Sequence, residues 1–277
     1  MMTTEEGCFS SSDGLKLFYR RWNSSQPARA RLILVHGISE HSQRYENLAQ
    51  HLVSRGFSVW AMDHRGHGLS QGRRCDCTST QQFVDDLHQF LRHISVPSSI
   101  PDFLIGHSLG GLVSFLYALR APQSVRGIAL SSPAFALAQP PSRMKVFLVE
   151  TLAKIAPTFP VPGGINPADL CRDPQVVEAY RRDSRIHRAL TARCAVALRE
   201  TLAQIPRLAP QLKVPCLLLQ AGNDKVCDAK TAADFVQWAP KGLVTFHLYE
   251  GYSHELFNEP GKERVIEDLC RWLENFF

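Results

Sequence analysis

The chain has 277 residues, of which 44% are hydrophobic and 21% are charged, and its formal net charge is +5. This length suits one large domain with an ample core, and the composition is ordinary for a soluble globular protein. No apolar run approaches the roughly 20 residues that a membrane-spanning helix needs. The polar, acidic start, Met1–Glu6, lacks the basic and apolar regions of a signal peptide, which predicts a cytoplasmic protein.

Charge and cysteine content argue against several kinds of partner. The basic residues gather between Arg172 and Arg199 without the interleaved aromatics typical of a nucleic-acid surface, so we expect a solvated helix face and no nucleic-acid partner. Eight cysteines in a chain of this length do not indicate a disulfide framework. Cys75 and Cys77 form a C-x-C pair without further ligands at zinc spacing, so we expect a surface loop. Neither a metal nor an organic cofactor is implied.

The first half of the chain alternates strand patterns with amphipathic helix patterns. Residues 14–22 alternate after a turn signal, which predicts an edge hairpin strand. Leu32–Val35 is wholly apolar, as in a strand buried on both faces of a parallel sheet. Further along, we predict a helix at 45–54, a strand at 57–62, a helix at 79–94, and strands at 103–105 and 125–130.

The alternation stops between residues 134 and 207, where we expect no strand. Helical patterns at 142–156 and 174–204 flank a loop rich in proline and glycine. We therefore predict an α/β fold with a mostly parallel, doubly wound sheet. Its core comprises residues 1–133 and 208–277, and residues 134–207 are inserted as a helical cap. The alternation resumes with a strand at 214–219, a helix near 229–238, a strand at 244–249 and a closing helix at 261–276.

One stretch combines a strand, a sharp turn and a helix around a serine. An apolar strand pattern ends at Gly106, and a helical pattern begins at Leu109. Between them, Gly106, Ser108 and Gly110 form a G-x-S-x-G pattern, whose glycines allow a backbone approach too close for a Cβ. Such a turn projects the Ser108 hydroxyl clear of the sheet and aims helix N–H groups at whatever the serine attacks. We predict Ser108 as a nucleophile; the alternative is a glycine-rich turn of some other α/β protein.

A serine hydroxyl becomes a good nucleophile when a histidine takes its proton and a carboxylate orients that histidine. In sheets of this kind the chain order is serine, acid, histidine. Asp224 follows the strand at 214–219, and His254 follows the strand at 244–249. Both therefore lie on loops at the carboxyl edge of the sheet, where Ser108 also lies. We predict these three residues as a catalytic triad.

Other residues could fill the acid and base roles. Asp228 follows the same strand as Asp224, but we expect it to cap the next helix. His247 falls within a strand pattern, where a packed or surface histidine is expected. His64 and His67 lie in a glycine-rich loop after a different strand, and we expect them to order that loop.

The tetrahedral intermediate of acyl transfer needs two N–H donors for its oxyanion. One donor is expected from the backbone of Leu109, the residue after the nucleophile. The other is expected from Ile38, in the loop after the Leu32–Val35 strand. The alternative for that loop is a tight turn only.

Several of these segments together resemble the monoacylglycerol lipases and related lysophospholipases of the α/β-hydrolase superfamily. The elbow around the serine is shared by many hydrolases. Its combination with the pattern His-Gly-x-x-Glu-His-x-x-Arg-Tyr is much more specific. The similar segments span nearly the whole chain and include residues 34–45, 63–70, 106–111, 179–184, 218–228 and 249–255.

The resemblance implies an α/β-hydrolase fold and cleavage of a monoacylglycerol to fatty acid and glycerol. Ser108 would form an acyl-enzyme, and water activated by His254 would release the acid. Glu40, Arg44 and Tyr180 could line the polar end of the substrate site; the alternative is a salt bridge from loop to cap beside a packed tyrosine. The alternative functions are a lysophospholipase or a small-ester carboxylesterase, followed by an aminopeptidase or a non-catalytic ligand-binding protein of this fold.

The helical pattern at 142–156 is apolar over more than one narrow stripe, which includes Met144, Phe147 and Leu148. Such a helix in an insertion could pack on the core on one side and touch lipid on the other. We therefore consider peripheral contact with a membrane surface through 142–156; a well-buried cap helix is the alternative. The expected partner is a small lipid ester, and the sequence leaves acyl-chain length, head group and oligomeric state open.

Overall fold

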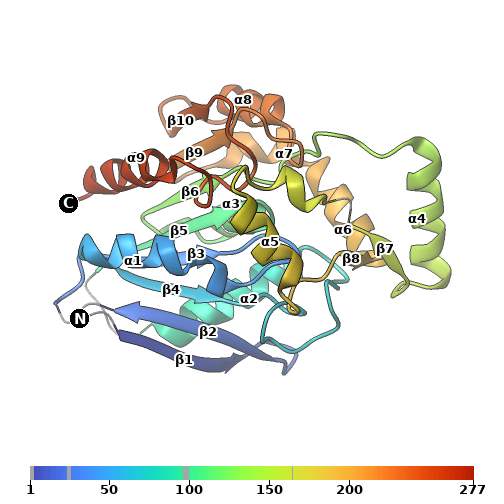
Figure 1. The fold of residues 1–277 in the computed structure, drawn as a ribbon, viewed down its shortest axis with the longest axis horizontal. Coiled ribbons are helices and arrows are strands. Elements are labelled where there is room, and N and C mark those ends of the chain that lie inside the picture. Colours follow the sequence, from blue (N-terminus) through green and yellow to red (C-terminus); the bar gives the residue numbers. More distant parts are fainter. Residues whose placement is uncertain (1–2, 24–25, 96–99, 164) are drawn as a thin grey trace.

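The computed structural model describes residues 3–23, 26–95, 100–163 and 165–277. A single large sheet organises these residues (Figure 1). In spatial order its strands are β1 (Thr3–Ser10), β2 (Lys16–Asn23), β4 (Ser58–Met62), β3 (Arg31–Val35), β5 (Asp102–His107), β6 (Gly127–Ser131), β9 (Cys216–Ala221) and β10 (Val244–Tyr249).

The pairing of these strands confirms the predicted, mostly parallel sheet. β1 pairs antiparallel with β2, and β2 pairs antiparallel with β4. All the other neighbours in the sheet are parallel. Parallel strands end at the same edge, so the loops after β3, β5, β9 and β10 meet there.

β1 is a strand that the sequence patterns do not predict. It pairs with β2 in full register, from Thr3 opposite Asn23 to Ser10 opposite Lys16. Its first half is polar and exposed on both sides. The alternation of buried and exposed side chains that marks a half-buried strand is therefore weak in this segment.

Helices cover both faces of the sheet and form two separate apolar clusters with it. α2 (Gln81–Ile94), α3 (Leu109–Arg120) and α8 (Ala229–Trp238) pack on one face. α1 (Glu46–Ser54) and α9 (Lys262–Glu274) pack on the other. Ile33 and Val35 of β3 point into the first cluster, while Leu32 and Leu34 point into the second. The predicted burial of this strand on both faces is confirmed.

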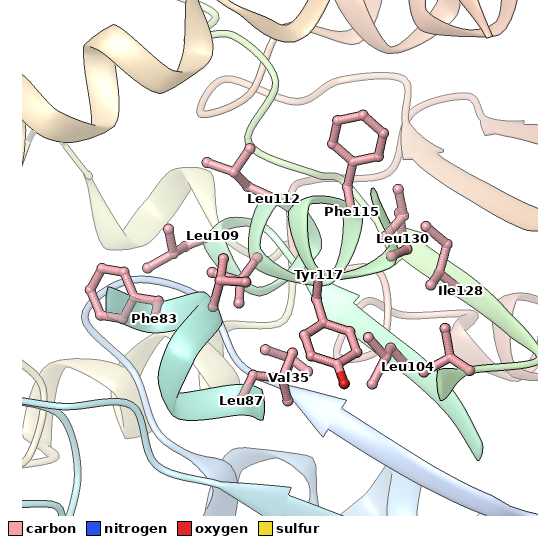
Figure 2. Packing of buried hydrophobic residues seen from close by; sticks show 14 of the residues in the cluster. Val35, Phe83, Leu87, Leu104, Leu109, Leu112, Phe115, Tyr117, Ile128 and Leu130 are labelled. Carbon is pink, nitrogen blue, oxygen red and sulfur yellow. The ribbon is translucent and has the colours of Figure 1, made fainter. Parts of the chain in front are cut away.

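Figure 2 shows how α3, the helix that follows Ser108, is held in place. Its side chains lie between those of α2, such as Phe83, and those of the sheet, such as Leu104 and Ile128. Burial of one leucine or phenylalanine side chain contributes about 1.5–3 kcal/mol. The packing of α3 therefore fixes the position of its N-terminus at the edge of the sheet.

The segment 134–207, which we call the cap segment, leaves the sheet after β6 and returns before β9. It contains a small antiparallel sheet of two strands, so the prediction that it lacks strands is wrong. Each strand has three residues, and two residues of one are prolines, which hides any strand pattern. Its elements are α4 (Arg143–Ile155), β7 (Pro160–Pro162), α5 (Pro174–Arg182), β8 (Ala189–Thr191) and α6 (Ala192–Leu202), and α7 (Ile205–Leu208) follows at the junction with the core.

α4 stands at the outer edge of the molecule and packs against α6 (Figure 1). None of its residues is buried. The side chains of Met144, Phe147, Leu148 and Ile155 are 66%, 63%, 52% and 76% exposed. The alternative of a well-buried cap helix is therefore wrong. Within the described residues, no helix is both long and apolar enough to cross a membrane.

Candidate active site

Ser108 occupies the turn between β5 and α3 in a strained backbone conformation. Its φ is 53°, in the left-handed region, which costs a non-glycine residue roughly 1–3 kcal/mol. Gly110 lets the turn close, because a Cβ at this position would overlap the carbonyl oxygen of Val35 at the end of β3. The serine therefore stands at the N-terminus of α3, where the helix dipole favours negative charge.

Asp224 and His254 are brought together from two loops at the same edge of the sheet. The Nδ1 of His254 donates to Oδ2 of Asp224 over 2.8 Å, and both side chains are buried. The other oxygen of Asp224 accepts the backbone N–H groups of Val226 and Cys227, each at 2.9 Å. These bonds fix the carboxylate and leave Nε2 of His254 free to act on another group.

The electrostatics of this pair favour a charged carboxylate beside a protonatable imidazole. Burial opposes the ionised form of Asp224, but the charge and hydrogen bond of His254 outweigh it and hold the pKa of Asp224 below its usual value. Burial likewise opposes the imidazolium, but Asp224 outweighs it and raises the pKa of His254 above 6.5. A histidine in this setting accepts a proton readily near neutral pH.

Ser108 lies close to Cys227, and Cys227 in turn lies close to Asp224 and His254. The hydroxyl of Ser108 is 4.0 Å from the thiol of Cys227. Ligating atoms of Cys227, Asp224 and His254 all lie within 4.8 Å of one another. No hydrogen bond joins Ser108 to His254 in the described structure, and such bonds often tighten only when substrate is bound.

Leu109 directly follows the serine, and Ile38 follows Gly37; their role as the oxyanion hole stays a prediction. Among the described residues, neither N–H group donates a hydrogen bond to another part of the chain. Gly37 lies so close to the nucleophile that a Cβ there would be 3.2 Å from Cβ of Ser108. The N–H of Gly37 itself donates to Oε1 of Glu40 over 2.6 Å. The N–H groups of Ile38 and Leu109 therefore stay the predicted donors for an oxyanion.

The structure brings together Glu40, Arg44 and Tyr180. Glu255, which the sequence analysis missed, joins them by binding Arg44. Nη1 of Arg44 donates to Oε2 of Glu40 over 2.7 Å. Nη1 and Nη2 also donate to the two oxygens of Glu255, over 2.6 and 2.7 Å. The guanidinium stacks on the ring of Tyr180 from the cap segment, 4.9 Å from its centre. This matches the salt bridge and packed tyrosine that we considered as the alternative; contact with substrate stays a prediction.

His107 is a second residue near the site that the sequence patterns do not single out. Its ring lies 4.7 Å from that of His254, and its Nδ1 donates to the carbonyl of Ser131 over 3.1 Å. Burial lowers its pKa to about 4, so the ring is neutral at pH 7. It packs against His254 without competing for the proton.

The other residues weighed for catalytic roles have structural partners. Asp228 caps α8, since its carboxylate accepts the N–H groups of Lys230 and Thr231 at 3.3 and 2.9 Å, which confirms the predicted cap. His247 is partly exposed beside Asp268, at 3.5 Å. The last two, His64 and His67, are buried in a cluster of rings with His36.

The C-x-C segment is not the surface loop that we expected. Cys75 and Cys77 are both buried. The thiol of Cys75 lies 3.6 Å from Nε2 of His67. The thiol of Cys77 contacts that of Cys194 on α6 at 3.2 Å. The segment is covered because the cap segment folds over it, and no local pattern in the sequence encodes that contact.

One group of potential metal ligands appears in the part of the chain that the structure describes. It consists of Asp224, Cys227 and His254, whose ligating atoms lie within 4.8 Å of one another. The carboxylate of Asp224 is already bound by His254 and by the N–H groups of Val226 and Cys227. These bonds suit a proton-transfer pair better than an ion, and we assign no metal to the group.

Comparison with known proteins identifies the family. The family model described as serine aminopeptidase, S33 (Hydrolase_4), matches residues 26–261. The chain is 32% identical over 273 residues to the monoacylglycerol lipase of Mycolicibacterium smegmatis, covering 98% of this chain and 97% of the relative. The chain belongs to the monoacylglycerol lipase-like α/β hydrolases. It is a serine hydrolase that acts on carboxylic esters.

Two further comparisons agree with this family. The crystal structure of the Paleococcus ferrophilus monoacylglycerol lipase has a TM-score of 0.83 to this chain at 27% identity, and the match covers 98% of each chain. Phospholipase YtpA of Bacillus subtilis is 32% identical over 250 residues, covering 89% of this chain and 95% of the relative. The predicted α/β-hydrolase fold and the resemblance to monoacylglycerol lipases are confirmed.

Proposed function

We propose that the chain hydrolyses monoacylglycerols to a fatty acid and glycerol. The observation that carries this proposal is its similarity to the Mycolicibacterium smegmatis monoacylglycerol lipase, over nearly the full length of both chains. The site geometry supports it, because Ser108, Asp224 and His254 lie at one edge of the sheet, and among the described residues the N–H groups of Ile38 and Leu109 donate no hydrogen bond.

Each of these residues has a step in the proposed reaction. As Ser108 Oγ attacks the ester carbonyl, its proton passes to Nε2 of His254, and the N–H groups of Ile38 and Leu109 bind the oxyanion. The ester C–O bond then breaks, and His254 returns the proton to the departing glycerol oxygen. Water attacks the acyl-enzyme in the same way, and the fatty acid leaves. Asp224 holds the imidazole in its tautomer and stabilises its charge throughout.

The polar end of the substrate site is proposed to lie near Glu40, Arg44 and Tyr180. The cap segment contributes Tyr180, so it would roof the site at this point. The charged atoms of Glu40 and Arg44 already bind each other. They would therefore shape the exit for glycerol. The uncharged glycerol would make weaker polar contacts there than Glu40 and Arg44 make with each other.

A peripheral contact with membrane lipid is proposed through α4. Its exposed apolar side chains include Phe147 and Leu148. Arg143, Lys145 and Lys154 on the same helix are also exposed. A helix that presents apolar side chains among basic ones suits an interface with anionic head groups. The enzyme would then collect a substrate that resides in a bilayer.

A lysophospholipase is the second candidate, and the similarity to phospholipase YtpA favours it. The chemistry at Ser108 would be unchanged, but the exit would have to admit a phosphorylated head group. A small-ester carboxylesterase would also use the same residues. An aminopeptidase, despite the description of the family model, would need acidic residues placed to hold a free amine.

The direct test is release of glycerol from monooleoylglycerol by the purified protein, together with labelling by a fluorophosphonate. We expect both with the wild type and neither with Ser108→Ala. Labelling without hydrolysis of the lipid would keep the mechanism and contradict the substrate. Absence of labelling would contradict the mechanism and favour a ligand-binding protein.

A further inference from the structure

Glu255 follows His254 in the chain but is no part of the proposed triad. Its side chain is buried, and its two oxygens accept three charged or polar N–H groups. Arg44 supplies two of these bonds, and Asn258 supplies the third at 2.9 Å. The backbone N–H of Glu255 donates to the carbonyl of Leu170 in the cap segment over 2.8 Å. A buried carboxylate with this many partners is held in one position.

The bonds continue from Glu255 to the loop that carries Ile38. Arg44 bridges Glu255 and Glu40 through the same Nη1 atom, at 2.6 and 2.7 Å. Oε1 of Glu40 accepts the N–H of Gly37 at 2.6 Å, and the hydroxyl of Tyr45 at 2.8 Å. Gly37 directly precedes Ile38, so its orientation fixes the peptide plane next to the proposed oxyanion donor.

The charges in this network also act on the histidine. Burial opposes ionisation of Glu255, but Arg44 outweighs it and lowers the pKa of Glu255 to about 2. Two carboxylates share one guanidinium, so the network carries an excess negative charge that adds to Asp224 in favouring protonated His254. The titratable groups that face His254 are Asp224, Cys227, Glu255, Glu40 and the neutral His107.

We propose that Glu255 is a positioning residue, which couples the loop of His254 to the loop of Ile38 through Arg44 and Glu40. The inference rests on the proposed function, because it concerns the same reaction. The ring of Tyr180 stacks on Arg44, so the cap segment touches the same network. A shift of the network would move the proposed oxyanion donor Ile38 relative to Ser108, and displacements of this kind cost up to about a hundredfold in rate.

The test compares Glu255→Gln with Glu267→Gln, using a soluble p-nitrophenyl ester. Glu255→Gln keeps the shape of the side chain and removes its charge. We expect kcat to fall about tenfold or more with KM within about twofold, because no contact of Glu255 itself with the substrate is proposed. The acid limb of the kcat/KM profile should move to lower pH, because a negative charge near His254 is lost. Glu267 pairs with Arg55 on the surface at 2.7 Å, and its variant should match the wild type.

Unchanged kcat and an unchanged pH profile in Glu255→Gln would overturn the proposal. A lower melting temperature with normal kinetics would also overturn it, since that indicates a structural role only. If Glu255→Gln does not fold, Glu255→Asp serves instead: it should keep the acid limb and lose turnover, and normal turnover would overturn the proposal. A wild type without esterase activity would contradict the proposed function instead.

Discussion

The carboxyl edge of the sheet and helix α4 differ in how they hold the side chains that we propose to be functional. At the edge, Ser108, Asp224 and His254 are buried and held by packed elements and hydrogen bonds. On α4 no residue is buried, and Phe147 is 63% exposed. Chemistry needs fixed geometry, whereas contact with a fluid lipid surface needs exposed apolar area. Substitutions in the two regions should therefore have separable effects.

The largest effect is expected at the edge of the sheet from Ser108→Ala. Removal of the nucleophile should lower kcat by about a millionfold, leaving only the contribution of binding and of the oxyanion donors. Ester hydrolysis and fluorophosphonate labelling are the measurements. A variant that keeps a hundredth of the activity would exclude Ser108 as the nucleophile.

Asp224→Asn should have the next largest effect, with a loss of about 10⁴-fold in kcat. The amide would favour the wrong tautomer of His254 and would not stabilise the imidazolium. The matched control is Asp228→Asn, which changes a helix cap nearby. Asparagine also caps helices well, so this control should retain wild-type kcat. Equal losses in both variants would mean that we have chosen the wrong carboxylate.

Gly110→Ala should lower the stability of the protein, because it disturbs the close packing at the carboxyl edge of the sheet. The added Cβ overlaps the carbonyl oxygen of Val35, which is backbone and cannot rotate away. We expect destabilisation of about 3 kcal/mol, measured by urea denaturation. Gly14→Ala serves as a comparison in open space, where only the positive φ of 85° opposes the change. Similar stability in the Gly110 variant and the wild type would refute the close approach.

The smallest effect on stability and soluble-ester hydrolysis is expected on α4, from the double variant Phe147→Ser with Leu148→Ser. Because both side chains are already exposed, stability and hydrolysis of a soluble ester should stay within about twofold of the wild type. Binding to vesicles that contain anionic phospholipid should fall at least about tenfold, since each side chain loses apolar burial in lipid. Leu248→Ser, an exposed leucine on β10, is the control. Equal loss of vesicle binding and soluble activity would indicate that α4 packs on the core.

The same contrast explains what the sequence could reveal. α8 and its cap at Asp228 follow from signals a few residues apart, as does the turn at Ser108. The bond between Arg44 and Glu255 joins residues 211 positions apart, and nothing local encodes it. The contact of Cys77 with Cys194 spans 117 positions and depends on how the cap segment folds back. Local rules therefore predict the elements and the loops, while the packing between loops requires the structure.

The most direct test of the proposed function compares two lipids with the same acyl chain, a monoacylglycerol and a lysophosphatidylcholine. The measurement is kcat/KM for each, with the wild type and with Ser108→Ala as the blank. We predict a strong preference for the glycerol ester that disappears in the variant. Equal or faster turnover of the phospholipid would contradict the account and assign the protein to the lysophospholipases.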